Sequence, residues 1–137
     1  MEAVGRLVVL RGLPGAGKST WIAHNLPHAR ACSADHFFRV ADGAYAFDER
    51  RLGEAHAACV RCAIEAMAGR APVVVVDNTH VRRWEWSVVV AAALALGYAV
   101  EVVDLFDGGL DDAALAARNQ HGVPAQAIAE MRARWER

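Results

Sequence analysis

The sequence predicts an α/β fold, a three-layer sandwich in which a parallel sheet of about four strands is flanked by helices. Helix-like and strand-like segments alternate along the 137 residues, an order typical of parallel strands joined by helical crossovers. Residues Val73–Val76 form a continuous β-branched run, as expected of a strand buried on both faces. A glycine-rich loop separates the first strand-like segment from the first helix-like segment. Because the chain contains no linker, repeat or low-complexity tract, we expect residues 1–137 to form a single domain.

The first half of the chain supplies two strands and two helices. Apolar runs, prolines and glycines set their expected limits. In chain order, we expect a strand at about Gly5–Arg11, a helix at about Lys18–Leu26 stopped by Pro27, a short strand at Arg30–Ser33, an irregular stretch at Phe37–Asp48 with a turn at Gly43, and a helix at about Glu49–Ala68 ended by Gly69.

The second half repeats the alternation. Aspartates and a proline mark the starts of its last two helices, and glycines mark helix ends. We expect a strand at Val73–Val76, a helix at about Arg83–Leu96 ended by Gly97, a strand at Tyr98–Leu105, a helix capped by Asp111 or Asp112 that runs to about Gln120 and ends by Gly122, and a last helix from Pro124 to about Trp135.

Residues 12–19 read Gly-Leu-Pro-Gly-Ala-Gly-Lys-Ser and match the phosphate-loop pattern G-x-x-x-x-G-K-[ST] between a strand and a helix. Glycines let backbone N–H groups close around phosphate oxygens, and a helix N-terminus favours an anion. The loop therefore predicts a P-loop NTPase-type fold that binds ATP and Mg²⁺. Lys18 would reach the β- and γ-phosphates, Ser19 would ligate Mg²⁺, and Thr20 would lie nearer the α-phosphate. The predicted nucleotide-binding residues are Gly12, Gly15, Ala16, Gly17, Lys18, Ser19 and Thr20.

Two aspartates follow predicted strands, at the sheet edge where ligands bind in open α/β folds. Asp77 in such a place commonly positions Mg²⁺ or its waters; the alternative is a cap of the next turn. Asp35 is placed to accept the proton of an attacking hydroxyl, as the general base of phosphoryl transfer. The alternative for Asp35 is a helix cap or a surface charge. The residues expected to contact substrate along this rim are Asp77, Asn78, Thr79 and His80.

Arg118 lies on the polar side of the helix after the fourth predicted strand. In small kinases this region often forms a lid over the phosphates, and an arginine there would stabilise charge in the transition state. The alternative is a solvated surface arginine. His36, His80 and His121 are also expected near the crevice.

Arginines and tryptophans are interleaved at residues 82–86, which read Arg-Arg-Trp-Glu-Trp. Such a cluster suits single-stranded nucleic acid, since bases stack on aromatic rings and arginines hold phosphates. The sequence favours the alternative, in which the charges start a helix and both tryptophans are buried in the core.

Composition and charge limit the classes of protein to which the chain can belong. A net charge of −1 gives no overall attraction to nucleic acid. The sequence contains no signal peptide and no apolar run of the roughly 18 residues that would span a bilayer, so we expect a cytoplasmic protein without a membrane partner. An odd number of cysteines, three, predicts reduced thiols. Cys59 and Cys62 form a lone C-x-x-C, which we interpret as two small residues on a packed helix face rather than a metal or redox site.

Four segments together resemble the small P-loop kinases grouped with the phage-type polynucleotide 5′-kinase, the zeta-toxin kinases and the kinase-like part of cyclic nucleotide phosphodiesterase. They are Gly12–Thr20, Ser33–Phe38, Asp77–His80 and Ala117–Pro124. The resemblance runs nearly end to end. It implies that Lys18 and Ser19 bind ATP·Mg²⁺, that Asp35 is the general base and that Arg118 is a lid arginine.

The chain departs from the polynucleotide kinases at two positions. An acceptor-phosphate arginine stands three residues after the base in those enzymes, where this chain has Phe38. A second lid arginine is replaced by Gly122, with His121 beside it.

Three functions follow from these observations. The leading hypothesis is an ATP-dependent phosphotransferase that moves the γ-phosphate to a hydroxyl, above all the 5′-OH of a nucleic acid. The second is a kinase for a small molecule of nucleotide-sugar type, favoured by Phe38 and the low net charge. The third is a nucleotide-binding regulatory module with little turnover. The sequence leaves the oligomeric state and the acceptor open.

Overall fold

The computed structural model describes residues 2–39 and 46–137, and the turn predicted at Gly43 lies outside these residues. Within the described part of the chain, the strands form one four-stranded sheet in the order β2-β3-β1-β4, and every adjacent pair is parallel. The strands are β1 (Arg6–Gly12), β2 (Arg30–Cys32), β3 (Val73–Asn78) and β4 (Ala99–Phe106). The α-helices are α1 (Lys18–Asn25), α2 (Leu52–Ala68), α3 (Ser87–Ala95), α4 (Asp112–Arg118) and α5 (Ala125–Ala133). The 3₁₀ helices are η1 (Ala34–Phe38), η2 (Glu49–Arg51) and η3 (Arg83–Trp86).

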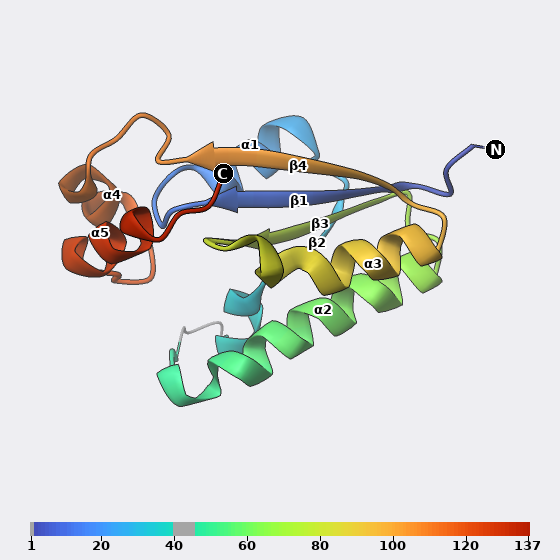
Figure 1. The fold of residues 1–137 in the computed structure, drawn as a ribbon, viewed down its shortest axis with the longest axis horizontal. Helices are drawn as coiled ribbons and strands as arrows, with labels where there is room; N and C mark the ends of the chain where they lie inside the picture. Colours follow the sequence, from blue (N-terminus) through green and yellow to red (C-terminus); the bar gives the residue numbers. More distant parts are fainter. Residues whose placement is uncertain (1, 40–45) are drawn as a thin grey trace.

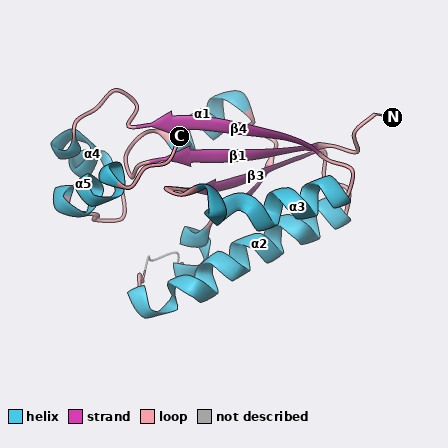
Figure 2. Ribbon diagram, in the orientation of Figure 1, coloured by secondary structure: helices cyan, strands magenta, loops and turns pink. Residues whose placement is uncertain are grey.

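The helices form layers on both faces of the sheet, as predicted (Figures 1 and 2). Alternate residues of β1 point to opposite faces, so Val8 and Leu10 pack against α1. Leu7 and Val9 pack on the other face, in a larger core that includes α2 and α3. Helices α4 and α5 lie beyond the carboxyl ends of the strands rather than on either face (Figure 1).

Strand register brings the polar ends of β1 and β3 together. Leu10 of β1 pairs with Asp77, and Arg11 pairs with Asn78. Strand β3 is therefore longer than the predicted Val73–Val76, because the backbones of Asp77 and Asn78 continue the hydrogen-bond ladder. The carboxyl edge of the sheet consequently carries the phosphate loop and the Asp77 segment side by side.

The predicted helices start later or end earlier in the structure, and 3₁₀ turns occupy part of the difference. The helix expected from Glu49 begins with η2, and the helix expected from Arg83 begins with η3. η1 extends into the first two residues of the irregular stretch expected at Phe37–Asp48. Its N-cap Ser33 accepts a hydrogen bond from the N–H of Asp35 at 3.1 Å. No helix in the described ranges combines the length and apolarity that crossing a membrane requires.

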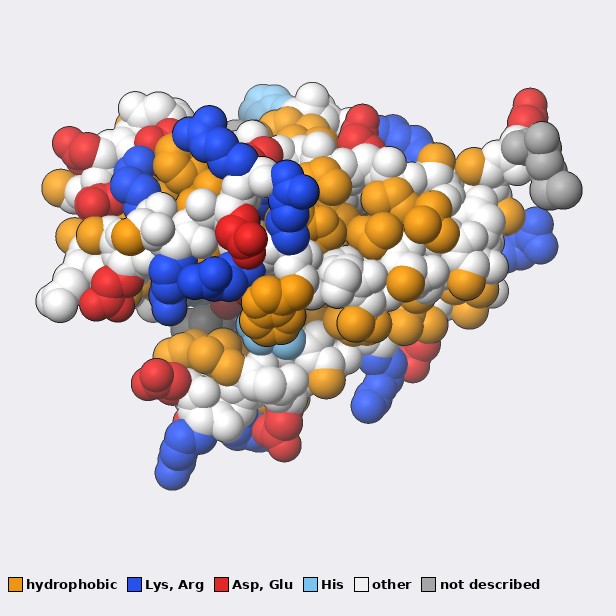
Figure 3. Space-filling view, viewed as in Figure 1, with side chains coloured by type: hydrophobic (Ala, Val, Ile, Leu, Met, Phe, Trp, Pro, Cys, Tyr) orange, Lys and Arg blue, Asp and Glu red, His pale blue; other side chains and the backbone are white. Residues whose placement is uncertain are grey.

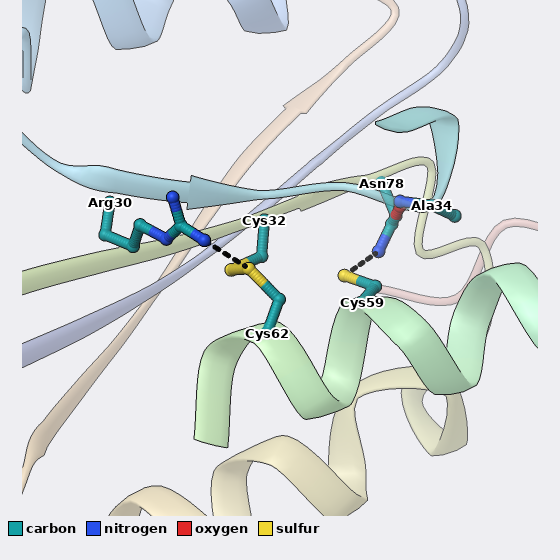
Figure 4. The surroundings of a disulfide bond; sticks show 6 residues. All are labelled: Arg30, Cys32, Ala34, Cys59, Cys62 and Asn78. Carbon is teal, nitrogen blue, oxygen red and sulfur yellow. Dashed lines mark hydrogen bonds between the residues drawn. A yellow bond between two sulfur atoms is a disulfide. The ribbon is translucent and has the colours of Figure 1, made fainter. Parts of the chain in front are cut away.

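The cysteines depart from the expectation of three reduced thiols, which is wrong for two of them. Cys32 at the end of β2 and Cys62 in α2 form a disulfide with their Cα atoms 5.9 Å apart (Figure 4). Cys59 is a buried free thiol that accepts a hydrogen bond from the Asn78 amide at 3.4 Å. The sequence grouped Cys59 with Cys62, whereas helix packing places Cys62 against a strand distant in sequence. The expected cytoplasmic location stays a prediction.

Candidate functional site

The phosphate loop joins β1 to α1, and two of its glycines adopt left-handed backbone conformations. Gly15 has φ +84° and Gly17 has φ +102°. A side chain at Gly15 would collide with the backbone of Leu115 in α4, so both space and conformation confine this position to glycine. Gly17 is the N-cap of α1 and carries no side chain, so no capping group competes with an anion for the first-turn N–H groups.

Lys18, the only lysine in the sequence, is half-buried over the loop that precedes it. Its Nζ donates hydrogen bonds to the carbonyl oxygen of Gly12 at 2.8 Å and to that of Leu13 at 3.4 Å. Burial lowers the pKa of Lys18, and the negative charges of Asp77 and Asp35 oppose this shift. The ammonium therefore binds the backbone of the phosphate loop and lies within electrostatic range of both predicted carboxylates.

Asp77 occupies the carboxyl end of β3. Burial raises the pKa of Asp77, against the opposing effect of Lys18; Asp35 adds to the rise, while His36 and His121 counter it. Its Oδ1 is inaccessible and has no hydrogen-bond partner among the residues described. A buried carboxylate oxygen without a donor is the kind of atom that a metal ion or a metal-bound water satisfies.

Mg²⁺ fits this donor set. Among residues 2–39 and 46–137, no three His, Cys, Asp or Glu side chains are grouped to hold a metal ion. Mg²⁺ usually needs only one or two protein oxygens in addition to substrate phosphates and waters. Asp77 and the exposed hydroxyl of Ser19 on the first turn of α1 can supply these oxygens.

Asp35 is carried by η1, directly after β2. The turn is held at two points, by the Ser33 cap and by a hydrogen bond from the Ala34 N–H to Asn78 Oδ1 at 2.9 Å. The Asp35 carboxylate is partly exposed, and its Oδ2 lies 3.3 Å from Nε2 of His121. The structure thus places Asp35 at the same edge as Asp77 and Lys18.

The remaining residues of the predicted substrate rim contact the protein itself. Asn78 links η1 to Cys59, as described above. The Thr79 carbonyl accepts a hydrogen bond from the Gly12 N–H at 3.3 Å. His80 is buried with φ +51°, and its Nδ1 lies 3.0 Å from the carbonyl oxygen of Leu10. Contact of these residues with a substrate stays a prediction.

Arg118 is exposed at the end of α4 and lines a groove of about 450 Å³ beside the phosphate loop. Ala16, Gly17 and Thr20 line the same groove. Arg118 and three residues of the phosphate-loop segment therefore share one groove. The action of Arg118 on the transition state stays a prediction.

Arg11 is buried at the end of β1, and its structural role was not predicted from the sequence. Its side chain is 2% exposed and donates to the carbonyl oxygens of His80 at 3.1 Å and Val81 at 3.2 Å, and it pairs with Asp104 at 3.1 Å. The arginine therefore ties the rim after β3 to β4. A charged residue at the end of an apolar strand is the feature of the sequence that could have indicated this role.

The expectation that both tryptophans of η3 are buried in the core is wrong, because Trp84 is exposed and Trp86 is only partly buried. Trp84 is 70% exposed, whereas Trp86 packs edge-on against His80 and lies over Arg11. The exposed Trp84 ring lies in η3, shortly after the rim residues Asp77–His80.

The sequence and the fold of this chain are both similar to those of known proteins. A family described as "AAA domain" matches residues 7–137. Human NEDD4-binding protein 2 is 36% identical over 140 residues, which cover 96% of this chain and 8% of that protein. The chain therefore spans only a small part of this relative.

Solved structures show the same fold at low identity. A chain of the Pnkp1/Rnl/Hen1 RNA repair complex superimposes with a TM-score of 0.70 at 19% identity, over 98% of this chain and 44% of that chain. The APS kinase of Mycobacterium tuberculosis, in complex with AMPPNP and APS, gives 0.61 at 19% identity, over 95% of this chain and 76% of that chain. A gluconokinase from Sinorhizobium meliloti 1021 gives 0.57 at 20% identity, over 100% of this chain and 78% of that chain. The architecture is therefore that of the P-loop kinases.

Proposed function

The chain belongs to the AAA domain family, and from that premise we propose that it is an ATP-dependent phosphotransferase that moves the γ-phosphate to the 5′-OH of a polynucleotide. The gathering of Lys18, Asp35 and Asp77 at the phosphate loop is the main support for the transfer chemistry. This set supplies a cation for the phosphates, a base for the acceptor and a buried carboxylate for the metal.

The transfer step follows from these roles. The acceptor oxygen forms a bond to the γ-phosphorus while the bond from that phosphorus to the β,γ-bridging oxygen breaks, and ADP leaves. The acceptor proton passes to the Asp35 carboxylate. Lys18 and the first-turn N–H groups of α1 hold the phosphates, and Arg118 stabilises the charge of the transition state. Ser19 and Asp77 would hold Mg²⁺, which when bound neutralises charge on the β- and γ-phosphates.

A polynucleotide acceptor is supported by the surface beside the crevice. Trp84 is flanked by the exposed Arg82 and Arg83, and the Arg83 Nε donates to the carbonyl oxygen of Arg137 at 2.8 Å, so η3 and the C-terminal segment lie together. Figure 3 shows Lys and Arg side chains, mixed with acidic ones, on the part of the molecule that carries α4, α5 and the C-terminus. Arginines beside an exposed ring suit a single strand. The fold's likeness to a chain of an RNA repair complex agrees with such an acceptor.

A small-molecule acceptor is the second candidate. Phe38 is 4% exposed and packs against Phe37 and Phe47, so the position that holds an acceptor arginine in the polynucleotide kinases is used for packing here. The gluconokinase and APS kinase folds show that this architecture also serves small acceptors.

Radiolabel transfer separates the two candidates. The protein is incubated with γ-labelled ATP, Mg²⁺ and either 5′-OH oligonucleotides, the same oligonucleotides with a 5′-phosphate, or a metabolite pool. We expect label only on the 5′-OH strands. Label confined to the metabolite pool would establish the second candidate, and ATP binding without transfer to any acceptor would leave a regulatory module.

Trp84→Ala tests the proposed nucleic-acid surface. Stacking of one base contributes about 1–3 kcal/mol, so we expect the KM for an oligonucleotide to rise by roughly tenfold while the KM for ATP is unchanged. Leu94→Ala is the matched control, because Leu94 is an exposed apolar residue of α3 with 63% exposure. Equal effects of the two substitutions would remove Trp84 from the acceptor surface.

A further inference from the structure

We propose that His121 is a positioning residue for the transfer step, in which its imidazole holds the Asp35 carboxylate at the acceptor side of the crevice. This inference rests on the proposed function of Asp35 as the general base. The contact joins Nε2 of His121 to Oδ2 of Asp35 at 3.3 Å, between the α4–α5 loop and η1. The two residues are distant in sequence, and each is held by its own framework.

Asn119 builds the turn that presents His121. Its side-chain oxygen accepts hydrogen bonds from the N–H groups of His121 at 3.2 Å and Val123 at 2.9 Å. Its amide donates to the carbonyl oxygens of Ala116 at 3.0 Å and Val123 at 3.0 Å. One side chain thus binds the backbone on both sides of His121, which fixes the direction in which the imidazole leaves the loop.

The same loop is anchored to the phosphate loop. Leu115 of α4 is fully buried and clusters with Leu13, which follows the end of β1, and with Ile128 of α5. The Leu115 backbone also lies against Gly15. The buried Leu115 and Ile128 thus anchor both ends of the loop that carries His121 against the phosphate loop.

The Asp35 side of the contact is held independently. Ser33 caps η1, and Asn78 at the end of β3 binds the Ala34 N–H. The backbone of Asp35 is consequently fixed, and its partly exposed carboxylate turns toward the α4–α5 loop, where Oδ2 lies 3.3 Å from Nε2 of His121. The imidazole therefore contributes to the orientation of this carboxylate.

The orientation of the Asp35 carboxylate matters for the rate of phosphoryl transfer. A base must lie within hydrogen-bond reach of the proton that it abstracts, and a misplacement of about 1 Å can reduce the rate about 100-fold. Burial raises the pKa of Asp77, and Lys18, His36 and His121 oppose this rise. His121 therefore contacts Asp35 and lies within electrostatic range of Asp77.

The test compares His121→Ala and His121→Gln in the full chain. Glutamine carries an amide nitrogen near the position of Nε2, so it can restore the donor. We expect His121→Ala to lower kcat by at least about tenfold with the KM for ATP unchanged, and His121→Gln to recover most of the loss. His28→Ala is the matched control, since His28 is an exposed histidine in the turn after α1.

A double-mutant cycle shows whether His121 acts through Asp35. In an Asp35→Ala background the base is absent, so we expect His121→Ala to change the residual rate by less than about twofold. An equally large effect in both backgrounds would overturn the proposal, as would a His121→Ala variant with wild-type kcat.

A spectroscopic measurement separates failure of this inference from failure of the proposed function. The contact predicts a shift of the His121 ring ¹⁵N resonances in Asp35→Ala, with the His28 resonances unchanged. A protein that transfers no phosphate to any hydroxyl refutes the proposed function, and with it the role of His121, even where the resonances respond. An active protein whose His121 resonances ignore Asp35→Ala refutes the positioning role alone.

Discussion

The guanidinium carbon of Arg11 lies 4.1 Å from the centroid of the Trp135 ring, and the Trp86 ring lies on it at 4.6 Å. A strand residue one position before the phosphate loop is thus enclosed by two indoles, and its nitrogens bind the rim after β3 and Asp104 of β4. The C-terminal segment is thereby attached to the edge that carries the site.

Arg11→Ala should therefore destabilise the protein strongly. The substitution leaves a space between the rings and removes the Arg11 donor from the carbonyl oxygen of His80 and one of two donors from that of Val81. We therefore expect a loss of about 3–5 kcal/mol in the free energy of unfolding. Arg6→Ala is the matched control on the same strand, because Arg6 pairs with Glu101 of β4 in the open at 2.9 Å and should lose only about 0–1 kcal/mol. Urea titrations of both variants measure the difference, and similar midpoints would contradict the assignment.

Lys18→Ala should abolish ATP binding and leave the fold intact. The side chain provides the only lysine charge of the chain, and its Nζ lies at the phosphate loop, on the carbonyl oxygens of Gly12 and Leu13. Calorimetric titration with ATP and Mg²⁺ measures the affinity, and far-UV circular dichroism checks the fold. An unchanged affinity would remove the phosphate loop from nucleotide binding.

Arg118→Ala should reduce kcat by about a thousandfold, which corresponds to roughly 4 kcal/mol of transition-state stabilisation. Because the side chain is exposed, the melting temperature should not change. Arg61→Ala on the exposed face of α2 is the control for loss of a surface charge. A reduction of less than tenfold would return Arg118 to the role of a solvated arginine.

His80 should make the protein sensitive to acid. Burial lowers the pKa of His80 from 6.5 to about 4, so the folded protein keeps the imidazole neutral where the unfolded chain is protonated. Its contribution to stability is complete above pH 6.5 and is lost as the pH falls toward 4, by about 3 kcal/mol in all. His80→Asn suits the positive φ at this position and should flatten the pH dependence, whereas His28→Asn should not. Urea midpoints measured across this range test the difference, and equal slopes in all three proteins would exclude His80 as the cause.

The disulfide should contribute to stability by restricting the unfolded chain. Its cysteines are separated by 30 residues, for which loop closure predicts about 3–4 kcal/mol. The Cys32→Ser/Cys62→Ser double variant should show this loss without reductant, and dithiothreitol should lower the wild type to the same level while leaving the variant unchanged. If dithiothreitol leaves the stability of the wild type unchanged, the bond is not formed in solution.

Local patterns predicted most of the fold. The Val73–Val76 run, the glycine loop and the helix stops identified every strand and α-helix of the described residues. The errors lie at the ends of these elements, and 3₁₀ turns account for only some of them. The same patterns predicted that Lys18, Asp35 and Asp77 would share one edge, because parallel strands bring their carboxyl ends together.

Contacts between distant segments could not be predicted in this way. The Cys32–Cys62 bond depends on how α2 lies across β2, and the pairing of His121 with Asp35 depends on how the α4–α5 loop folds back. Trp84 was misjudged because a tryptophan's preference for burial says nothing of which face of η3 it occupies. These are tertiary effects with no signal in local spacing.

Gly15 and Leu115 meet so closely that only a hydrogen atom fits between the phosphate loop and α4. A side chain of any size at position 15 would therefore have to displace α4 from the phosphate loop. The spacing between this loop and the helix that carries Arg118 is thus set by the missing Cβ of one residue.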